Sequence, residues 1–339
     1  MLIRINSCFF CALAASAFLD AQTPMHTAAV ELEFTPRVSA AYWAGGFMAE
    51  YSRAINNATP TVWLFDREGN RVTPPVPISF PDAPSSEIHA VTADSSGNLY
   101  ASAEAWANGG SGTGMICKIS RGGQSIQVIR TDDFLAVALA VAETGEIWAF
   151  GLPLELQATQ STESDYMTLW RFDASGRVID KSLPRSSFGH DIIPTHAFGD
   201  VGWPRLSANG TRVGLYSATA NRWMEFDAST GKTLADLRVP RPKAADGSIG
   251  AIGMVVITES GDVYARSGYQ TAVNEGSGIL KLDKTNSKWM PQTAAPCQES
   301  CASLYGADGN HLIMRYGNGT SHSWTFAWVD ASVLASAAH

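Results

Sequence analysis

Three carboxylates occupy equivalent positions in distant parts of the chain. Each lies ten residues before the glycine of a similar turn, and they are Glu87, Asp200 and Glu299. Convergent carboxylate oxygens suit a hard cation, since Ca²⁺ takes about 6–8 oxygen ligands. The pattern therefore predicts a site for Ca²⁺ or another divalent cation where these positions meet. The alternative is that the acids are solvated or accept hydrogen bonds from free backbone N–H groups.

A histidine accompanies the first of these acids. His89 follows Glu87 by two residues, so in an extended strand both side chains point to the same side. An imidazole changes charge near neutral pH and serves as a metal ligand or a general base. His89 and Glu87 are therefore the candidate catalytic pair.

A second polar cluster lies in the segment 187–203. It holds four potential ligands or acid/base groups within eleven positions, namely His190, Asp191, His196 and Asp200. The spacing of the two histidines is not a zinc signature, and Pro194 argues against a helix that would hold both rings on one side. A structured surface loop is the alternative. Other long loops contribute candidate ligand-stacking residues, which are Trp106, Tyr269 and His322.

The composition argues against one class of partner, and several catalytic and binding motifs are absent. The formal net charge is −8, with no run of Lys or Arg, which argues against a nucleic-acid backbone as partner. No Gly-x-Ser-x-Gly elbow, His-Glu-x-x-His, P-loop or EF-hand loop is present. If the chain is an enzyme, its catalytic residues come from separate parts of the sequence.

The N-terminal segment predicts export. Arg4 precedes an apolar run, 8–19, which is shorter than the roughly 20 residues that cross a bilayer. Residues 1–21 thus fit a cleaved signal peptide, and 22–339 would be one secreted or periplasmic domain without a transmembrane span. In an oxidising compartment Cys297 and Cys301 would form a local disulfide, with a metal site as the alternative.

The elements that position these residues follow from an internal repeat. An aromatic-rich strand is followed by a turn at six markers, which are Asp66, Ser120, Asp173, Asp227, Asp283 and Asp330. The steps between them are 54, 53, 54, 56 and 47 residues, and each unit holds two hairpins with alternating apolar residues. Repeated four-stranded antiparallel units predict an all-β fold, a six-bladed β-propeller. Most of the ten tryptophans would fill the space between blades.

Ring closure and loop length complete the prediction. The fourth strand of blade 6 comes either from the C-terminal residues 333–339 or from the better-alternating segment 28–34. We label the four strands of a blade A to D in chain order. The A–B and C–D connections are short turns. All the long connections are B–C or D–A, and these emerge on one face of the ring. Long loops in a compact domain tend to carry function. We name the two ends of the ring the long-loop end and the short-turn end.

Three turn segments carry a resemblance to a known family. They are ADSSGNLYAS at 93–102, AETGEIWAFG at 142–151 and ITESGDVYARS at 257–267. The chain resembles the exported six-bladed propellers of the NHL-repeat and gluconolactonase-like superfamily, which includes senescence marker protein. The resemblance implies a divalent metal held by Glu, Asn and Asp in the central channel. Only the acids have counterparts here, and the Asn-x-Arg expected before strand C is missing.

Two functions from different classes follow. The first is a binding propeller that recognises a small molecule, a glycan or a protein on the long-loop end. The second is a metal-dependent hydrolase or lactonase at the channel mouth, which would use Glu87, His89, Asp200 and Glu299. The absence of enzyme motifs favours the first.

Overall fold

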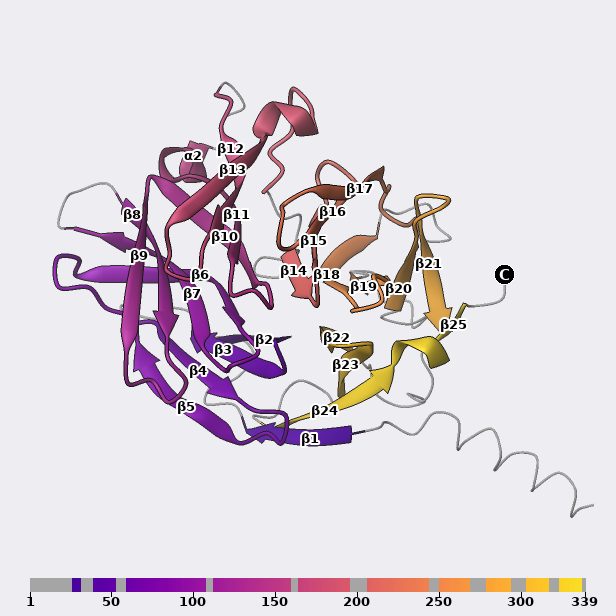
Figure 1. Ribbon diagram of the computed structural model, residues 1–339, viewed down its shortest axis with the longest axis horizontal. Helices are drawn as coiled ribbons and strands as arrows, with labels where there is room; N and C mark the ends of the chain where they lie inside the picture. The colour runs from indigo at the N-terminus through magenta and orange to yellow at the C-terminus, as the bar shows by residue number, and fades with distance from the viewer. Residues whose placement is uncertain are drawn as a thin grey trace, which may run out of the picture.

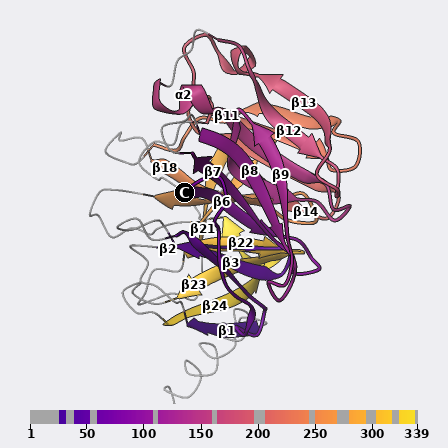
Figure 2. The same cartoon turned by 90° about the vertical axis from the view of Figure 1, so that its left-hand side faces the viewer.

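The chain folds into six antiparallel sheets arranged around a common axis (Figure 1). The computed structural model describes residues 26–31, 39–52, 59–107, 112–159, 164–195, 206–243, 250–268, 279–293, 303–316 and 323–336. Five sheets have four strands and one has five, so the predicted all-β, six-bladed propeller is confirmed. Figure 2 shows the same ring turned by 90°.

The strands of each blade follow the order of the sequence. Blade 1 contains β2 (Ser39–Ala44), β3 (Phe47–Ser52), β4 (Thr61–Phe65) and β5 (Arg71–Pro77). Blade 2 contains β6 (Ser85–Ala93), β7 (Leu99–Trp106), β8 (Gly112–Ile119) and β9 (Ile126–Asp132). Blade 3 contains β10 (Phe134–Val141), β11 (Ile147–Pro153), β12 (Met167–Phe172) and β13 (Val178–Pro184), with α2 (Leu154–Thr159) between its second and third strands.

The second half of the ring repeats this arrangement. Blade 4 contains β14 (Leu206–Asn209), β15 (Arg212–Ser217), β16 (Arg222–Asp227) and β17 (Thr233–Arg238). Blade 5 contains β18 (Ala251–Ile257), β19 (Val263–Gly268), β20 (Ile279–Asp283) and β21 (Lys288–Thr293). Blade 6 contains β22 (Ser303–Asp308), β23 (His311–Tyr316) and β24 (Ser323–Asp330). Short 3-10 helices follow β13 and β24 at Arg185–Phe188 and Ala331–Val333.

The N-terminal segment closes the ring. Strand β1 (His26–Glu31) pairs antiparallel with β24, from His26 opposite Trp328 to Glu31 opposite Ser323. Of the two alternatives left open by the sequence, the N-terminal strand therefore completes blade 6. The C-terminal β25 (Ala335–Ser336) instead pairs with β21 as a fifth strand of blade 5. This pairing covers the outer edge of β24 and joins the N-terminal and C-terminal parts of the chain in one sheet.

The core lies between the faces of neighbouring blades. Alternation sends one set of side chains of each strand toward the preceding blade and the other set toward the following blade. Most tryptophans predicted to fill these interfaces are buried, with Trp63, Trp148 and Trp223 at 1% exposure or less. Trp170 differs, because it is only partly buried and stacks on Phe134 with ring centroids 4.3 Å apart.

Aspartates at the C–D turns explain the repeat found in the sequence. The Asp173 carboxylate accepts hydrogen bonds from the backbone N–H groups of Ser175 and Arg177, both at 3.0 Å. Asx turns of this kind recur at Asp66, Asp227 and Asp283, and Asp330 accepts in the same way from the Ser332 N–H at the start of the 3-10 helix after β24. The Ser175 hydroxyl is the largest cause that lowers the pKa of Asp173 to about 2, and the Thr230 hydroxyl does the same for Asp227, also to about 2. Each marker is thus a side chain that folds its own turn.

Several sequence predictions fall outside the described residues. The signal peptide at 1–21 and the Cys297–Cys301 disulfide are among them. Within the described part of the chain, Cys117 is a buried free cysteine, and burial raises the pKa of its thiol to about 12. In that same part, none of the helices has the length and apolar character needed to span a membrane.

Candidate functional site

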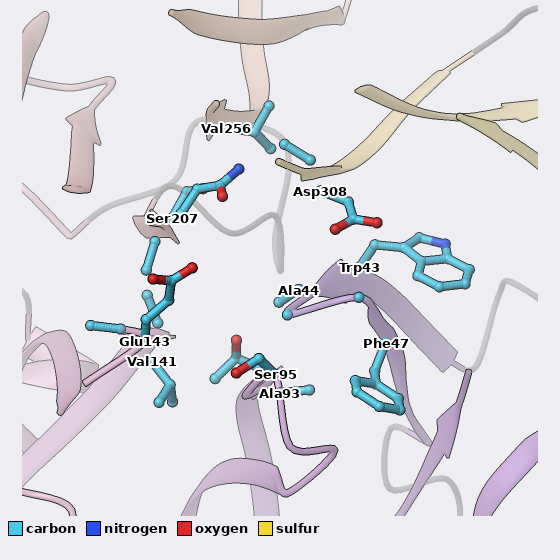
Figure 3. A pocket seen from close by; sticks show the side chains of 18 of the residues that line it. Trp43, Ala44, Phe47, Ala93, Ser95, Val141, Glu143, Ser207, Val256 and Asp308 are labelled. Atoms are coloured by element: carbon cyan, nitrogen blue, oxygen red, sulfur yellow. The ribbon is translucent and has the colours of Figure 1, made fainter. Parts of the chain in front are cut away.

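A pocket opens at the short-turn end of the central channel. It has a volume of about 530 Å³ and is lined by residues from all six blades (Figure 3). The A strands and the turns that follow them form its wall, which includes Trp43, Val91, Leu139, Leu206, Val256 and Ala307. These strands pack against one another around the axis, so the pocket is part of the ring itself.

The lining combines polar and apolar surface in similar amounts, and charged groups gather at the mouth. Glu143 and Asp308 lie on opposite sides of the opening, and Ser95 lies on a third side, below both in the view of Figure 3. Asp308 is occupied, because it forms an ion pair with Arg67 and accepts a hydrogen bond from Trp328 Nε1 at 3.1 Å. Glu143 and Glu259 are exposed and have no cation beside them in the described part of the chain.

Hydrogen bonds between turns of different blades hold the mouth in place. The Asn209 amide of blade 4 donates to the backbone oxygens of Ile257 in blade 5, at 3.2 Å, and of Gly309 in blade 6, at 2.9 Å. The Glu259 backbone N–H also donates to the Gly309 carbonyl, at 3.0 Å. On the other side, Gly45 has a φ of +59° and approaches the Asp94 backbone so closely that a Cβ would lie 2.6 Å from the carbonyl carbon. The pocket is therefore preformed rather than built from mobile side chains.

Of the predicted divalent-cation site the structure describes one residue, Glu87, which lies at the opposite, long-loop end. Glu87 is exposed near the start of β6, whereas Asp200 and Glu299 lie outside the described residues. Among the residues that the structure does describe, no group of three His, Cys, Asp or Glu side chains is placed to hold a metal. Convergence of the three predicted carboxylates stays a prediction.

The structure brings His89 to a different acid from the one expected. His89 Nε2 lies 3.7 Å from Glu104 Oε2, and Glu104 is the cross-strand partner of Glu87 in the β6–β7 hairpin. A β-bulge in β6 causes this, because Ile88 pairs with Ala103 and Ala90 with Ser102, which leaves His89 as the extra residue. Sequence reasoning overlooked Glu104, although a charged residue within the apolar strand 99–106 was a visible signal.

The surroundings of this acid are unusual. Glu104 is 4% exposed, and its Oε2 atom has no hydrogen-bond partner in the described part of the molecule. The same is true of His89 Nε2 and of Ser102 Oγ on the neighbouring positions. Gly112 leaves space for the carboxylate, because a Cβ at this position would lie 2.2 Å from Glu104 Oε1. Buried polar atoms are nearly always hydrogen-bonded, so three orphans in one place need an explanation.

The described part of the histidine-rich segment, residues 187–195, forms a structured surface loop after blade 3. The buried Arg185 guanidinium donates to the carbonyl oxygens of Gly189, His190 and Ser164, at 3.2, 2.7 and 3.2 Å. These bonds fix the chain, but the His190 and Asp191 side chains are 92% and 90% exposed and contact each other at 2.8 Å. His196 lies outside the described residues, so its distance from this pair stays open.

The other predicted ligand-binding residues come from separate parts of the chain. Trp106 ends β7 opposite Ser85 and is partly buried. Tyr269 and His322 fall outside the described residues. The described members of the predicted binding set, Trp106, His190 and Asp191, come from blade 2 and from the segment after blade 3.

Comparisons with known proteins identify no family for the chain. No protein-family model matches the sequence, and no curated protein matches it. Among solved structures, a Bacteroides fragilis protein provisionally named an exported protein matches with a TM-score of 0.47 at 10% identity, over 91% of this chain and 96% of that one. A puromycin hydrolase matches with a TM-score of 0.44 at 11% identity, over 85% of this chain and 43% of that one, so this chain spans less than half of it. A Bacteroides fragilis protein provisionally named a 6-phosphogluconolactonase matches with a TM-score of 0.41 at 12% identity, over 88% and 83%. At these identities and TM-scores, none of the three carries an argument about ligands or activity.

Proposed function

We propose that this propeller is a binding protein that holds a small molecule in the channel pocket at its short-turn end. The observation that carries the proposal is the preformed cavity of about 530 Å³, lined by all six blades. Ligand pockets are typically about 300–1,000 Å³, mostly apolar, with a few polar groups that fix orientation. The A strands supply apolar surface, and the mouth supplies polar and charged groups in similar measure.

The charges at the mouth favour a neutral or cationic ligand. The lining includes two guanidinium groups, Arg67 and Arg121, and five carboxylates, Asp66, Glu68, Glu143, Glu259 and Asp308. Arg67 is engaged by Asp308, and the Arg121 guanidinium lies over the Phe47 ring at 5.4 Å. Glu143 and Glu259 remain to meet a positive group, while an anionic ligand would be repelled. We therefore expect an amine-bearing molecule with an apolar body.

The experiment separates the two ends of the ring. A fragment library divided into amines, neutral compounds and carboxylates is screened by ligand-observed NMR against the wild-type chain, Ala44→Trp and Trp106→Ala. Ala44 is a small residue at the pocket mouth (Figure 3), so a large ring there obstructs entry. We expect amine fragments to bind the wild type, to lose at least tenfold in affinity in Ala44→Trp, and to be unaffected by Trp106→Ala.

Opposite results would move the site to the predicted long-loop end. If fragments bind Ala44→Trp as well as the wild type but fail to bind Trp106→Ala, the pocket is not the binding site. Binding of carboxylates in preference to amines would contradict the charge argument while leaving the location intact.

A metal-dependent hydrolase is the second candidate, and it rests on His89 at the long-loop end. Of the four residues expected to serve it, the structure describes His89 and Glu87, and Glu104 joins them through its 3.7 Å contact with His89. A lactone or ester that is consumed by the protein, and not in the presence of a chelator, would favour this function over simple binding.

A further inference from the structure

One face of the β6–β7 hairpin carries buried polar atoms that the described protein does not satisfy. His89 Nε2, Ser102 Oγ and Glu104 Oε2 have no hydrogen-bond partner there. Glu104 alternates with Ser102 and Tyr100 along β7, and Tyr100 packs with Phe134 and Ala136 of blade 3, so the face is turned toward blade 3. A buried carboxylate that accepts no hydrogen bond costs several kcal/mol unless a cation compensates it.

The separation of the two donor atoms matches a shared metal ion. A Zn²⁺ ion lies about 2.0–2.2 Å from His nitrogen and carboxylate oxygen ligands, so two ligands at a near-tetrahedral angle are roughly 3.4 Å apart. The His89 Nε2 to Glu104 Oε2 distance is 3.7 Å, which is too long for a hydrogen bond and needs only a small side-chain adjustment to hold an ion between the atoms.

Glu87 is positioned to supply a third ligand. It is the direct cross-strand partner of Glu104, and side chains at such positions have Cβ atoms about 4.5–5.5 Å apart. Its side chain is exposed, so it can rotate toward the pair without disturbing the packed interface. Although no three described ligands are in place at once, this single rotation would bring three together from one hairpin.

The ligand types decide the class of metal. Ca²⁺ and Mg²⁺ select oxygen ligands, whereas an imidazole nitrogen with carboxylates suits Zn²⁺ and neighbouring transition metals. The position of His89 beside Glu104 therefore changes the expected ion from Ca²⁺ to Zn²⁺. We propose that the β6–β7 hairpin holds a Zn²⁺-class site formed by His89, Glu104 and Glu87. The site is independent of the channel pocket, which lies at the other end of the ring.

The test measures metal binding directly on the mature chain, with any affinity tag removed. Equilibrium dialysis against Zn²⁺ should show one bound ion for each chain, and Co²⁺ loaded in its place should give the visible absorption of a low-coordinate nitrogen and oxygen site. Glu104→Gln and His89→Gln should each weaken Zn²⁺ binding by at least tenfold. His190→Gln is the matched control, because it removes an exposed histidine that also contacts a carboxylate, and it should bind as the wild type does.

Glu87→Gln keeps the test decisive if the buried variants fail to fold. Glu87 is exposed, so its replacement should leave folding intact and weaken Zn²⁺ binding by roughly tenfold. Absence of bound Zn²⁺ in the wild type would overturn the proposal. So would equal binding by the wild type and the folded Glu104→Gln or Glu87→Gln chain, or loss of the ion in His190→Gln, which would identify an adventitious surface site.

Discussion

Glu225 and Glu104 are both buried between neighbouring blades, and their surroundings differ. Glu225 of β16 faces blade 5 with a side chain only 1% exposed, and it forms ion pairs with Arg212 and Lys284. The Lys284 ammonium also donates to the Gly261 carbonyl at 2.7 Å. Glu104 of β7 is buried to a similar degree but has only His89, at 3.7 Å and without a hydrogen bond.

This difference indicates that Glu225 stabilises the fold, whereas Glu104 is a candidate for binding a ligand. The Glu225 carboxylate bridges a cation of blade 4 and a cation of blade 5, so the buried acid has its partners within the protein. Around Glu104 the fold provides burial and, through Gly112, space, but an incomplete set of partners. An incomplete set retained in a well-packed interface is what a ligand-binding position requires.

Removing the satisfied acid should produce the largest effect. Glu225→Gln leaves Arg212 and Lys284 facing a neutral amide, and breaking a buried ion pair costs about 3–5 kcal/mol. Because both cations are about a third exposed and can return to water, we expect a loss near the lower end, about 3 kcal/mol. Urea unfolding at pH 7 measures it, with Glu143→Gln as the exposed control. A loss below about 1 kcal/mol would contradict the structural role.

Removing the orphaned acid should have a smaller effect on stability, measured with a chelator present so that no bound metal contributes. With a chelator present, Glu104→Gln replaces a desolvated carboxylate by a neutral amide of the same shape. The free energy of unfolding should therefore change by less than about 1 kcal/mol or rise. The same urea experiment checks it. A loss comparable to that of Glu225→Gln would show that Glu104 has protein partners after all.

The turn aspartates provide a third, weaker case, in which backbone N–H and hydroxyl groups satisfy the acid. The pKa values of Asp173 and Asp227 are about 2, below their ordinary 3.8, so between these values the unfolded chain binds more protons than the folded one. Their contribution to stability is thus present above about pH 4 and is lost as the pH falls toward 2. We expect the double variant Asp173→Asn, Asp227→Asn to lose less stability than the wild type between pH 5 and pH 2.5. Urea unfolding at the two pH values measures both losses of stability. Equal losses in the wild type and the double variant would contradict this expectation.

Local chemistry made much of the fold predictable. Asp94, Asp173 and Asp227 fold their own turns, and Gly97 and Gly145 adopt positive φ values of +81° and +83° that favour glycine. Both features act within a few residues, so their spacing along the chain is enough to predict strands, hairpins and the number of blades. The exposed histidine loop was predictable for the same reason, from Pro194 and its polar composition.

The candidate sites were less predictable, because they depend on register. The alternation rule placed His89 and Glu87 on one side of a strand, but the bulge at His89 changed its neighbour to Glu104. The short-turn pocket was not expected at all, since loop length directed attention to the other end of the ring. Turns that look minimal in sequence form a cavity only when six of them meet at the axis.

Interactions between neighbouring residues therefore account for the blades, their turns and the alternation that buries their tryptophans. The tertiary structure decided which end of the chain completes blade 6, which acid meets His89 and where the described pocket opens. Residues that are separated by one or more blades do not interact locally, so no sequence pattern predicts that they lie close together. Strand β1 meets β24, and Asn209 meets Gly309, only because a closed ring brings them together.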